Sequence, residues 1–185
     1  MAETTYRGRQ AVSIENDELR VTVLRSGGHI AEIADKATGV NPLWTPKWRP
    51  DADFGTGSDA RLLAGIMGHN LCLDLFGGPS DDEFRAGVTA HGEGSVVDYE
   101  LTVEGGELVQ RAEMPLAQIR FERRITLHKH RVGIHETVES LAAFDRPIGW
   151  TQHVTLGEPF VERGVTRFEA TATKSKAASK RRKGR

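Results

Sequence analysis

His153 has the residue type and the setting for proton transfer. The segment around it alternates with period two, which places Trp150, Gln152, Val154 and Leu156 on one strand face and Thr151, His153 and Thr155 on the other. The first face is apolar enough to meet a core, so we expect His153 to point away from it. Because an imidazole titrates near neutral pH, His153 is a candidate general acid. The alternative is a surface histidine on a polar strand face.

A second candidate site surrounds His91, in the segment Ala90-His91-Gly92-Glu93-Gly94. The glycines on both sides of Glu93 would let the backbone approach a ligand closely. On an extended segment, two residues that are two apart project to the same side. We therefore expect both His91 and Glu93 to contact a substrate. A polar turn between strands is the alternative.

Trp44 is the third candidate for contact with a ligand. It lies with Trp48 in a segment interrupted by prolines, which is typical of a loop. Aromatic rings bind the apolar C–H face of a sugar, while polar side chains take its hydroxyl groups. We expect Trp44 to contact such a ligand, and ordinary packing under a long loop is the alternative.

His128 and His130 have a spacing that metal sites often use. A cupin-like metal protein would also need a nearby carboxylate, and Glu136 follows later in the chain than such sites place it. We therefore expect a solvated face here, with no metal and no cofactor. Glu136 itself falls among apolar neighbours, where an ion pair with an arginine such as Arg123 is the expected arrangement.

The elements that must position these residues are short strands. Segments 19–23, 97–103, 119–127 and 132–138 alternate apolar and polar residues, and Gly105-Gly106 marks a hairpin turn. Segment 61–67 is compatible with a helical turn or a strand. Because no long helical period occurs, the sequence predicts an all-β fold, an antiparallel β-sandwich or barrel.

Charge and composition narrow the functional classes. We expect one domain over residues 1–170 and a disordered basic tail over 171–185, because the tail is small, polar and basic. The net charge is −1, and seven Lys or Arg fall between Lys174 and Arg185, which leaves an acidic body. An acidic body argues against nucleic acid as a partner. The sequence has a single cysteine and no secretory signal, which predicts a cytoplasmic protein. It has no long apolar run, so we expect no membrane partner.

Four segments together resemble the aldose 1-epimerase family, the galactose mutarotase-like proteins. They are Asn16–Ile33, Gly68-His69-Asn70-Leu71, Ala90-His91-Gly92-Glu93, and Trp150-Thr-Gln-His153 with Gly157-Glu-Pro-Phe160. The resemblance covers about residues 12–161 and implies a large antiparallel β-sandwich with a sugar cleft. It also implies an isomerase of carbohydrate metabolism that interconverts sugar anomers without a cofactor. His153 resembles the family's general acid, and His91 resembles the histidine that positions the sugar.

The sequence departs from the family after His153. The family's general base is a glutamate on a later strand, and no glutamate of this chain occupies that place. We therefore expect an incomplete sandwich, which would leave an apolar sheet face uncovered and favour self-association. A non-catalytic carbohydrate-binding β-sandwich is the alternative to an aldose 1-epimerase-like isomerase.

Overall fold

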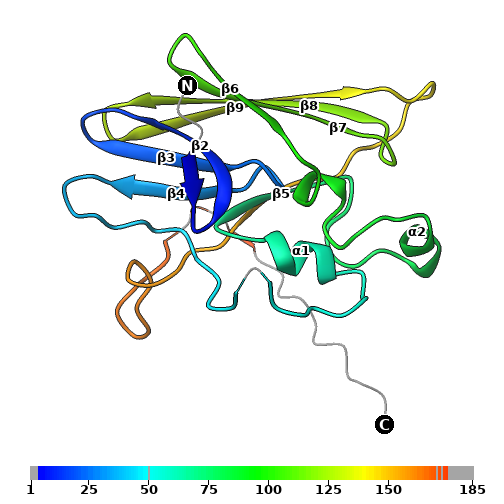
Figure 1. Cartoon of the computed structure of the whole chain (residues 1–185), viewed down its shortest axis with the longest axis horizontal. Coiled ribbons are helices and arrows are strands. Elements are labelled where there is room, and N and C mark those ends of the chain that lie inside the picture. Colours follow the sequence, from blue (N-terminus) through cyan, green and yellow to red (C-terminus); the bar gives the residue numbers. More distant parts are fainter. Residues whose placement is uncertain (1–3, 50, 170, 172, 175–185) are drawn as a thin grey trace.

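Two antiparallel β-sheets lie face to face in the computed structural model of the chain, which describes residues 4–49, 51–169, 171 and 173–174 (Figure 1). The larger sheet has the order β1-β2-β3-β4-β5-β10, with strands Thr4–Tyr6, Arg9–Glu15, Leu19–Leu24, Ile30–Asp35, His69–Leu73 and Trp150–Val154. The smaller sheet has the order β6-β7-β8-β9, with strands Glu100–Glu104, Glu107–Met114, Ile119–His128 and Arg131–Ser140. The predicted antiparallel β-sandwich is confirmed.

Local turn chemistry fixes the strand connections. Asn16 closes the β2–β3 turn, because its side-chain oxygen accepts hydrogen bonds from the backbone of Glu18 at 2.9 Å and Leu19 at 2.7 Å. Gly105 and Gly106 form the β6–β7 hairpin with φ of 60° and 89°, a region that favours glycine. Both reversals follow from residues that the sequence places between alternating segments.

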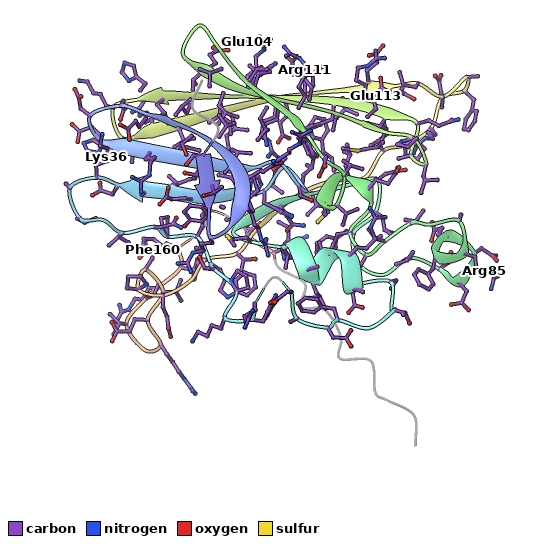
Figure 2. The ribbon with its side chains drawn as sticks, in the orientation of Figure 1. Lys36, Arg85, Glu104, Arg111, Glu113 and Phe160 are labelled. Atoms are coloured by element: carbon purple, nitrogen blue, oxygen red, sulfur yellow. The ribbon has the colours of Figure 1, made fainter. Side chains whose placement is uncertain are left out.

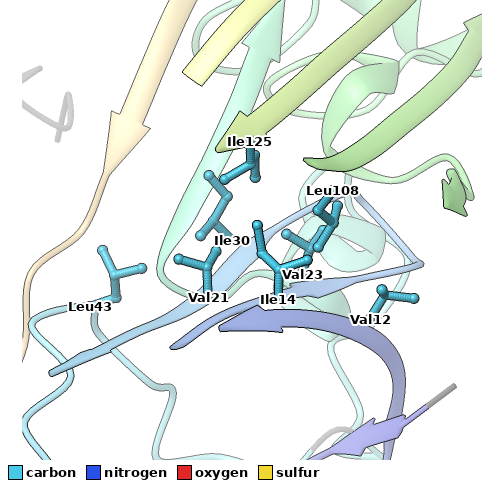
Figure 3. Packing of buried hydrophobic residues seen from close by; sticks show 8 residues of the cluster. All are labelled: Val12, Ile14, Val21, Val23, Ile30, Leu43, Leu108 and Ile125. Carbon is cyan, nitrogen blue, oxygen red and sulfur yellow. The ribbon is translucent and has the colours of Figure 1, made fainter. Parts of the chain in front are cut away.

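The core lies between the two sheets. Figure 3 shows one of its clusters, in which inward-facing residues of β2, β3 and β4 meet Leu108 of β7 and Ile125 of β8. A second cluster joins Leu71 and Leu73 of β5 to Phe121 of β8, among others. Because each strand contributes alternate residues to this space, the period-two pattern of the sequence becomes the inner face of the sandwich.

The outer face of the smaller sheet carries a set of ion pairs. The Arg111 guanidinium bonds Glu104 and Glu122, each at 2.7 Å, and Arg120 bonds Glu113 at 2.9 Å and Glu139 at 2.7 Å. Figure 2 shows Glu104, Arg111 and Glu113 along this face. Paired charges of this kind suit a surface that stays in contact with water.

Short helices lie outside the sheets. Segment 61–67, which the sequence left open between a helical turn and a strand, overlaps the helix α1, Ala60–Gly65. The Arg9 guanidinium donates to the carbonyl of Ala64 near the end of this helix, at 2.8 Å. The helix α2, Asp81–Arg85, begins with a capping box in which Ser80 and Glu83 bond each other's backbone. The short 3₁₀ helix η1 spans Glu93–Ser95. Among the described residues, neither of the α-helices has the length and hydropathy needed to cross a bilayer.

Three predictions concern the C-terminal tail, the domain boundary and the location of the protein. Most of the predicted disordered tail, residues 172 and 175–185, lies outside the described residues. The domain boundary at residue 170 and the cytoplasmic location stay predictions.

Candidate functional site

The pairing of β5 with β10 determines which way His153 points. Gln152 lies opposite Leu71, which is in the core, and His153 lies opposite Asn70. Since alternate residues of a strand face opposite sides, His153 and Thr151 share the outer face of the sheet with Asn70 and Cys72. His153 therefore points away from the core, as its alternating segment predicts.

On this outer face the structure brings together what we call the histidine cluster: Phe76, His91, His153 and Cys72. The rings of His91 and His153 have centroids 5.1 Å apart. The Phe76 ring lies 5.0 Å from the first imidazole and 5.7 Å from the second. Phe76 is 61% exposed, whereas Cys72 is 1% exposed and lies beneath the two imidazoles. The structure thus brings together the two predicted histidines, His91 and His153.

The loop between β5 and η1 positions His91. Its backbone N–H donates to the carbonyl of Gly77 at 2.9 Å, and the Gly77 N–H donates back to the ring atom Nδ1 of His91 at 3.2 Å. His91 adopts a φ of 64°, and Gly92 follows with a φ of 78°. A side chain at Gly92 would collide with the carbonyl of Leu73, so only glycine fits there.

The hydrogen bond from Gly77 also fixes the proton on His91. Because Nδ1 accepts a hydrogen bond, the neutral ring carries its proton on Nε2. Burial and the neighbouring charge of His153 lower the pKa of His91 below its usual value of 6.5. At neutral pH His91 is therefore an uncharged hydrogen-bond donor.

Beneath the imidazoles lies a buried polar layer. The Asn70 amide donates to the hydroxyl of Ser95 at 3.0 Å, and that hydroxyl donates to the Leu71 carbonyl at 2.7 Å. Burial raises the pKa of the Cys72 thiol to about 11, so the sulfur is protonated at neutral pH. This layer holds β5 and η1 together under the cluster.

The same cluster contains the donor atoms for a metal ion. One ligand atom each of Cys72, His91 and His153 lie within 4.8 Å of one another. A thiolate with two imidazoles and an open position is a donor set that suits Zn²⁺. The thiol would have to lose its proton, which its burial opposes.

The pair His128 and His130 does not form the strand-face site that its spacing describes. His128 ends β8, and His130 lies in the turn before β9, where its Nε2 is 3.6 Å from a carboxylate oxygen of Glu18. Both side chains are exposed. A cupin-like arrangement on one strand is therefore not present at these two residues.

Glu93 lies in a polar turn, the alternative that the sequence left open beside an extended segment. The segment is not extended, because η1 begins at Glu93 directly after the turn at His91. The Glu93 carboxylate is buried and accepts a hydrogen bond from the backbone of Ala117 at 2.7 Å. It anchors the loop in this structure, and its contact with a substrate stays a prediction.

Trp44 lies beside the segment that follows β10 and lines a hollow separate from the histidine cluster. Its backbone N–H donates to the Thr155 carbonyl at 2.8 Å, two residues beyond His153. Its ring lies 5.3 Å from that of Trp48, edge to face. With Arg7, Lys47 and Glu158 among others, it lines a hollow of about 640 Å³. A contact of Trp44 with a ligand stays a prediction.

A second polar group occupies the inner face, between the sheets. As expected, Glu136 pairs with the buried Arg123, with 2.6 Å between the carboxylate and Nε. Its other oxygen accepts hydrogen bonds from Trp150 at 2.9 Å and Gln152 at 2.6 Å, and Gln152 in turn bonds His69 at 2.6 Å. All of these residues except Arg123 line a hollow of about 520 Å³ that opens between β9 and β10.

Sequence reasoning missed Phe76, Asn70 and the role of Cys72. The pairing of β5 with β10, 83 residues apart at His69 and Gln152, would have placed Asn70 and Cys72 beside His153. No local pattern shows that pairing. The Ser80-x-x-Glu83 spacing, by contrast, is a sequence signal for α2 that went unused.

Comparisons with known proteins bear on the fold. No family model and no curated protein matches the sequence. The chain is similar to a galactose mutarotase-like protein from Lactobacillus casei, at 14% identity and a TM-score of 0.51, over 69% of this chain and 43% of that one. It also matches a galactose mutarotase related enzyme from Lactobacillus acidophilus, at 14% identity and a TM-score of 0.47, over 69% and 42% of the two chains.

A third match is a 4-alpha-glucanotransferase from Thermococcus litoralis, at 18% identity and a TM-score of 0.43, over 71% of this chain and 22% of that one. The chain spans less than half the length of each of these three proteins. The Lactobacillus casei match shows that the two sheets follow the fold of a galactose mutarotase-like protein.

Proposed function

We propose that the chain binds a sugar ring at the histidine cluster. The observation that carries the proposal is the exposed ring of Phe76 in contact with two imidazoles, at 5.0 and 5.7 Å. An aromatic ring covers the apolar C–H face of a sugar, and imidazole N–H groups bond its hydroxyls. The galactose mutarotase-like fold supports a carbohydrate ligand.

Aldose 1-epimerase-like isomerisation is the finer proposal, with His153 as the acid. Protonated His153 donates to the ring oxygen while the bond from that oxygen to C1 breaks. C1 becomes a carbonyl as its hydroxyl loses a proton to a base, and after rotation the steps reverse with the other anomer formed. His91, neutral with its proton on Nε2, donates to a sugar hydroxyl and positions the ring.

The proton on the C1 hydroxyl needs an acceptor, and the cluster offers a poor one. Nδ1 of His91 already accepts from Gly77, and the Cys72 thiol is protonated at neutral pH. Among the described residues, the donor atoms that lie within 4.8 Å of one another at His153 belong to Cys72 and His91, and none of them is a carboxylate oxygen. This observation favours a non-catalytic carbohydrate-binding β-sandwich as the second candidate.

Binding is tested first, by titrating glucose and galactose into the labelled protein and following backbone amide shifts by NMR. We expect shifts at Phe76 and His91, and loss of binding in Phe76→Ala. Phe168→Ala, which removes an exposed ring elsewhere, is the control and should bind like the native chain. If no sugar in a broad panel moves these signals, the proposal is wrong.

Catalysis is tested by polarimetry on freshly dissolved α-glucose or α-galactose. A rate above buffer that disappears in His153→Ala supports the isomerase. Binding without any rate above buffer assigns the second candidate, a binding protein.

A further inference from the structure

The opening between β9 and β10 is bordered by two strand edges that have no partner strand among the described residues. β9 is the last strand of the smaller sheet and β10 is the last strand of the larger one. Ile134 on β9 and Trp150 and Val154 on β10 are 44%, 46% and 52% exposed, although all three face the inner side of the sandwich. An exposed inner face beside free backbone groups is a surface that natural proteins cover.

The hydrogen-bond pattern shows which backbone groups are free at these edges. In β10, Gly149 bonds Asp74 and Thr155 bonds Gly68, so odd-numbered residues bond β5. Trp150, Gln152 and Val154 therefore direct their N–H and C=O groups outward. Directly after β9, the N–H of Leu141 donates to the carbonyl of Gln118, which directly precedes β8, so odd-numbered residues bond β8. By the same alternation, the even-numbered residues of β9 direct their N–H and C=O groups outward.

Each edge is complementary to itself in an antiparallel pair. Pairing β10 with a copy of itself about Gln152 places Trp150 opposite Val154 of the second copy, with outward backbone groups facing each other. Aromatic and β-branched residues opposite each other stabilise a sheet. The same register places His153 opposite Thr151 of the second copy on the outer face.

For β9, pairing about His135 places Arg131 opposite Glu139 of the second copy, and Val132 opposite Val138. Opposite charges then meet on the outer face, and on the inner face Val132 meets Val138 while Ile134 lies opposite Glu136. A shift of the centre to Glu136 would instead place two carboxylates opposite each other. The charges of β9 thus favour the register about His135 over the register about Glu136.

One symmetry axis serves both edges. Gln152, the centre of the β10 pairing, bonds Glu136 at 2.6 Å, and Glu136 is next to the centre of the β9 pairing. The two centres therefore lie across from each other, on a line that runs from one sheet to the other. A two-fold axis along this line would continue the larger sheet and the smaller sheet at the same time.

We propose that the chain forms a two-fold dimer in which β9 pairs with β9 and β10 with β10 of a second copy, closing the hollow lined by Trp150 and Val154. The two histidine clusters then lie beside each other, with Thr151 of each copy opposite His153 of the other. The dimer does not depend on sugar binding, so either proposal can fail alone.

Charge exchange on β9 tests the register. In Arg131→Glu and in Glu139→Arg, each dimer would place like charges opposite each other twice, and we expect the dissociation constant to rise about tenfold. An equal mixture of the two variants restores both attractive pairs, so a heterodimer of native affinity should form. Sedimentation equilibrium measures the dissociation constants of the two variants and of their mixture, and circular dichroism checks that each variant is folded.

Cross-linking gives a second readout on exposed positions. His135 lies on the axis, opposite His135 of the second copy. The two residues form a non-hydrogen-bonded pair, in which side chains of neighbouring strands approach most closely. His135→Cys should therefore form a covalent dimer on oxidation. The control Thr137→Cys faces Gly133 of the second copy and should stay monomeric. The proposal is overturned if the native chain is a monomer at every concentration. It is also overturned if mixing the charge variants restores nothing, or if both cysteine variants cross-link equally.

Discussion

Glu136→Gln should destabilise the chain far more than an ordinary loss of a surface charge. The guanidinium of Arg123 has a side-chain exposure of 1%, and the Glu136 carboxylate, at 7%, is its ionic partner. The remaining hydrogen-bond acceptors of Arg123 are the neutral oxygens of Gly28 and Gln110, at 3.3 and 3.0 Å. The substitution keeps the shape of the side chain, removes its charge and replaces one acceptor oxygen with an NH₂ donor.

The expected cost follows from the uncompensated charge of Arg123. Breaking a buried ion pair by removing one partner costs about 3 to 5 kcal/mol, whereas an exposed pair contributes less than about 1 kcal/mol. The new glutamine side chain would also present a donor to Trp150 or Gln152, which both donate to Glu136 in the native chain. We therefore expect a loss of about 3 kcal/mol in the free energy of unfolding.

Urea denaturation at one protein concentration measures this loss, with Glu113→Gln as the matched control. Glu113 pairs with Arg120 at 2.9 Å but is 62% exposed, so its substitution should change the free energy of unfolding far less. The double variant Arg123→Met/Glu136→Gln removes both charges and should be more stable than Glu136→Gln alone. Equal costs for Glu136→Gln and Glu113→Gln, or a less stable double variant, would refute the reasoning.

Three more predictions concern a buried histidine, a turn and the cluster. Burial lowers the pKa of His29 to about 3, so the unfolded chain takes up a proton on this residue before the folded chain does. The free energy of unfolding should therefore fall by about 2 kcal/mol from about pH 6.5 to about pH 5. Urea unfolding of His29→Gln should show a flatter pH dependence. Gly28→Ala should lower the thermal unfolding temperature more than Gly105→Ala does. Both glycines have a positive φ, but only at Gly28 would the new methyl group lie 2.7 Å from atoms of the Tyr99 ring. His153→Ala should raise the pKa of His91 in an NMR titration, because it removes a neighbouring positive charge, and an unchanged pKa would contradict that cause.

The sequence predicts what depends on neighbours along the chain. The alternation in β3 and β8 and the glycine pair at Gly105-Gly106 predict strands and a hairpin that the structure contains. The partner of Glu136 is predictable as well, because a carboxylate among apolar residues requires a cation, and Arg123 provides it. The outward direction of His153 follows from period two alone.

What depends on distant pairing is not predictable from one sequence. Cys72 joins His153 only because β10 lies beside β5, and nothing local in either segment specifies that register. The segment of Glu93 shows the same limit, since the sequence leaves both an extended segment and a polar turn open, and in the structure the chain turns at His91 and enters a 3₁₀ helix. Phe76 lay unnoticed in a loop, because an exposed aromatic residue has no periodic signal.

The late position of β10 in the chain has a consequence for how the molecule folds. Every other strand of its sheet ends at or before Leu73, so the whole smaller sheet is synthesised before the last member of the larger one arrives. Until then, Cys72 and His91 lack the third member of their cluster, His153. Amide exchange should therefore detect openings in which this strand detaches while the hairpins stay formed, and ligand affinity should disappear in step with them.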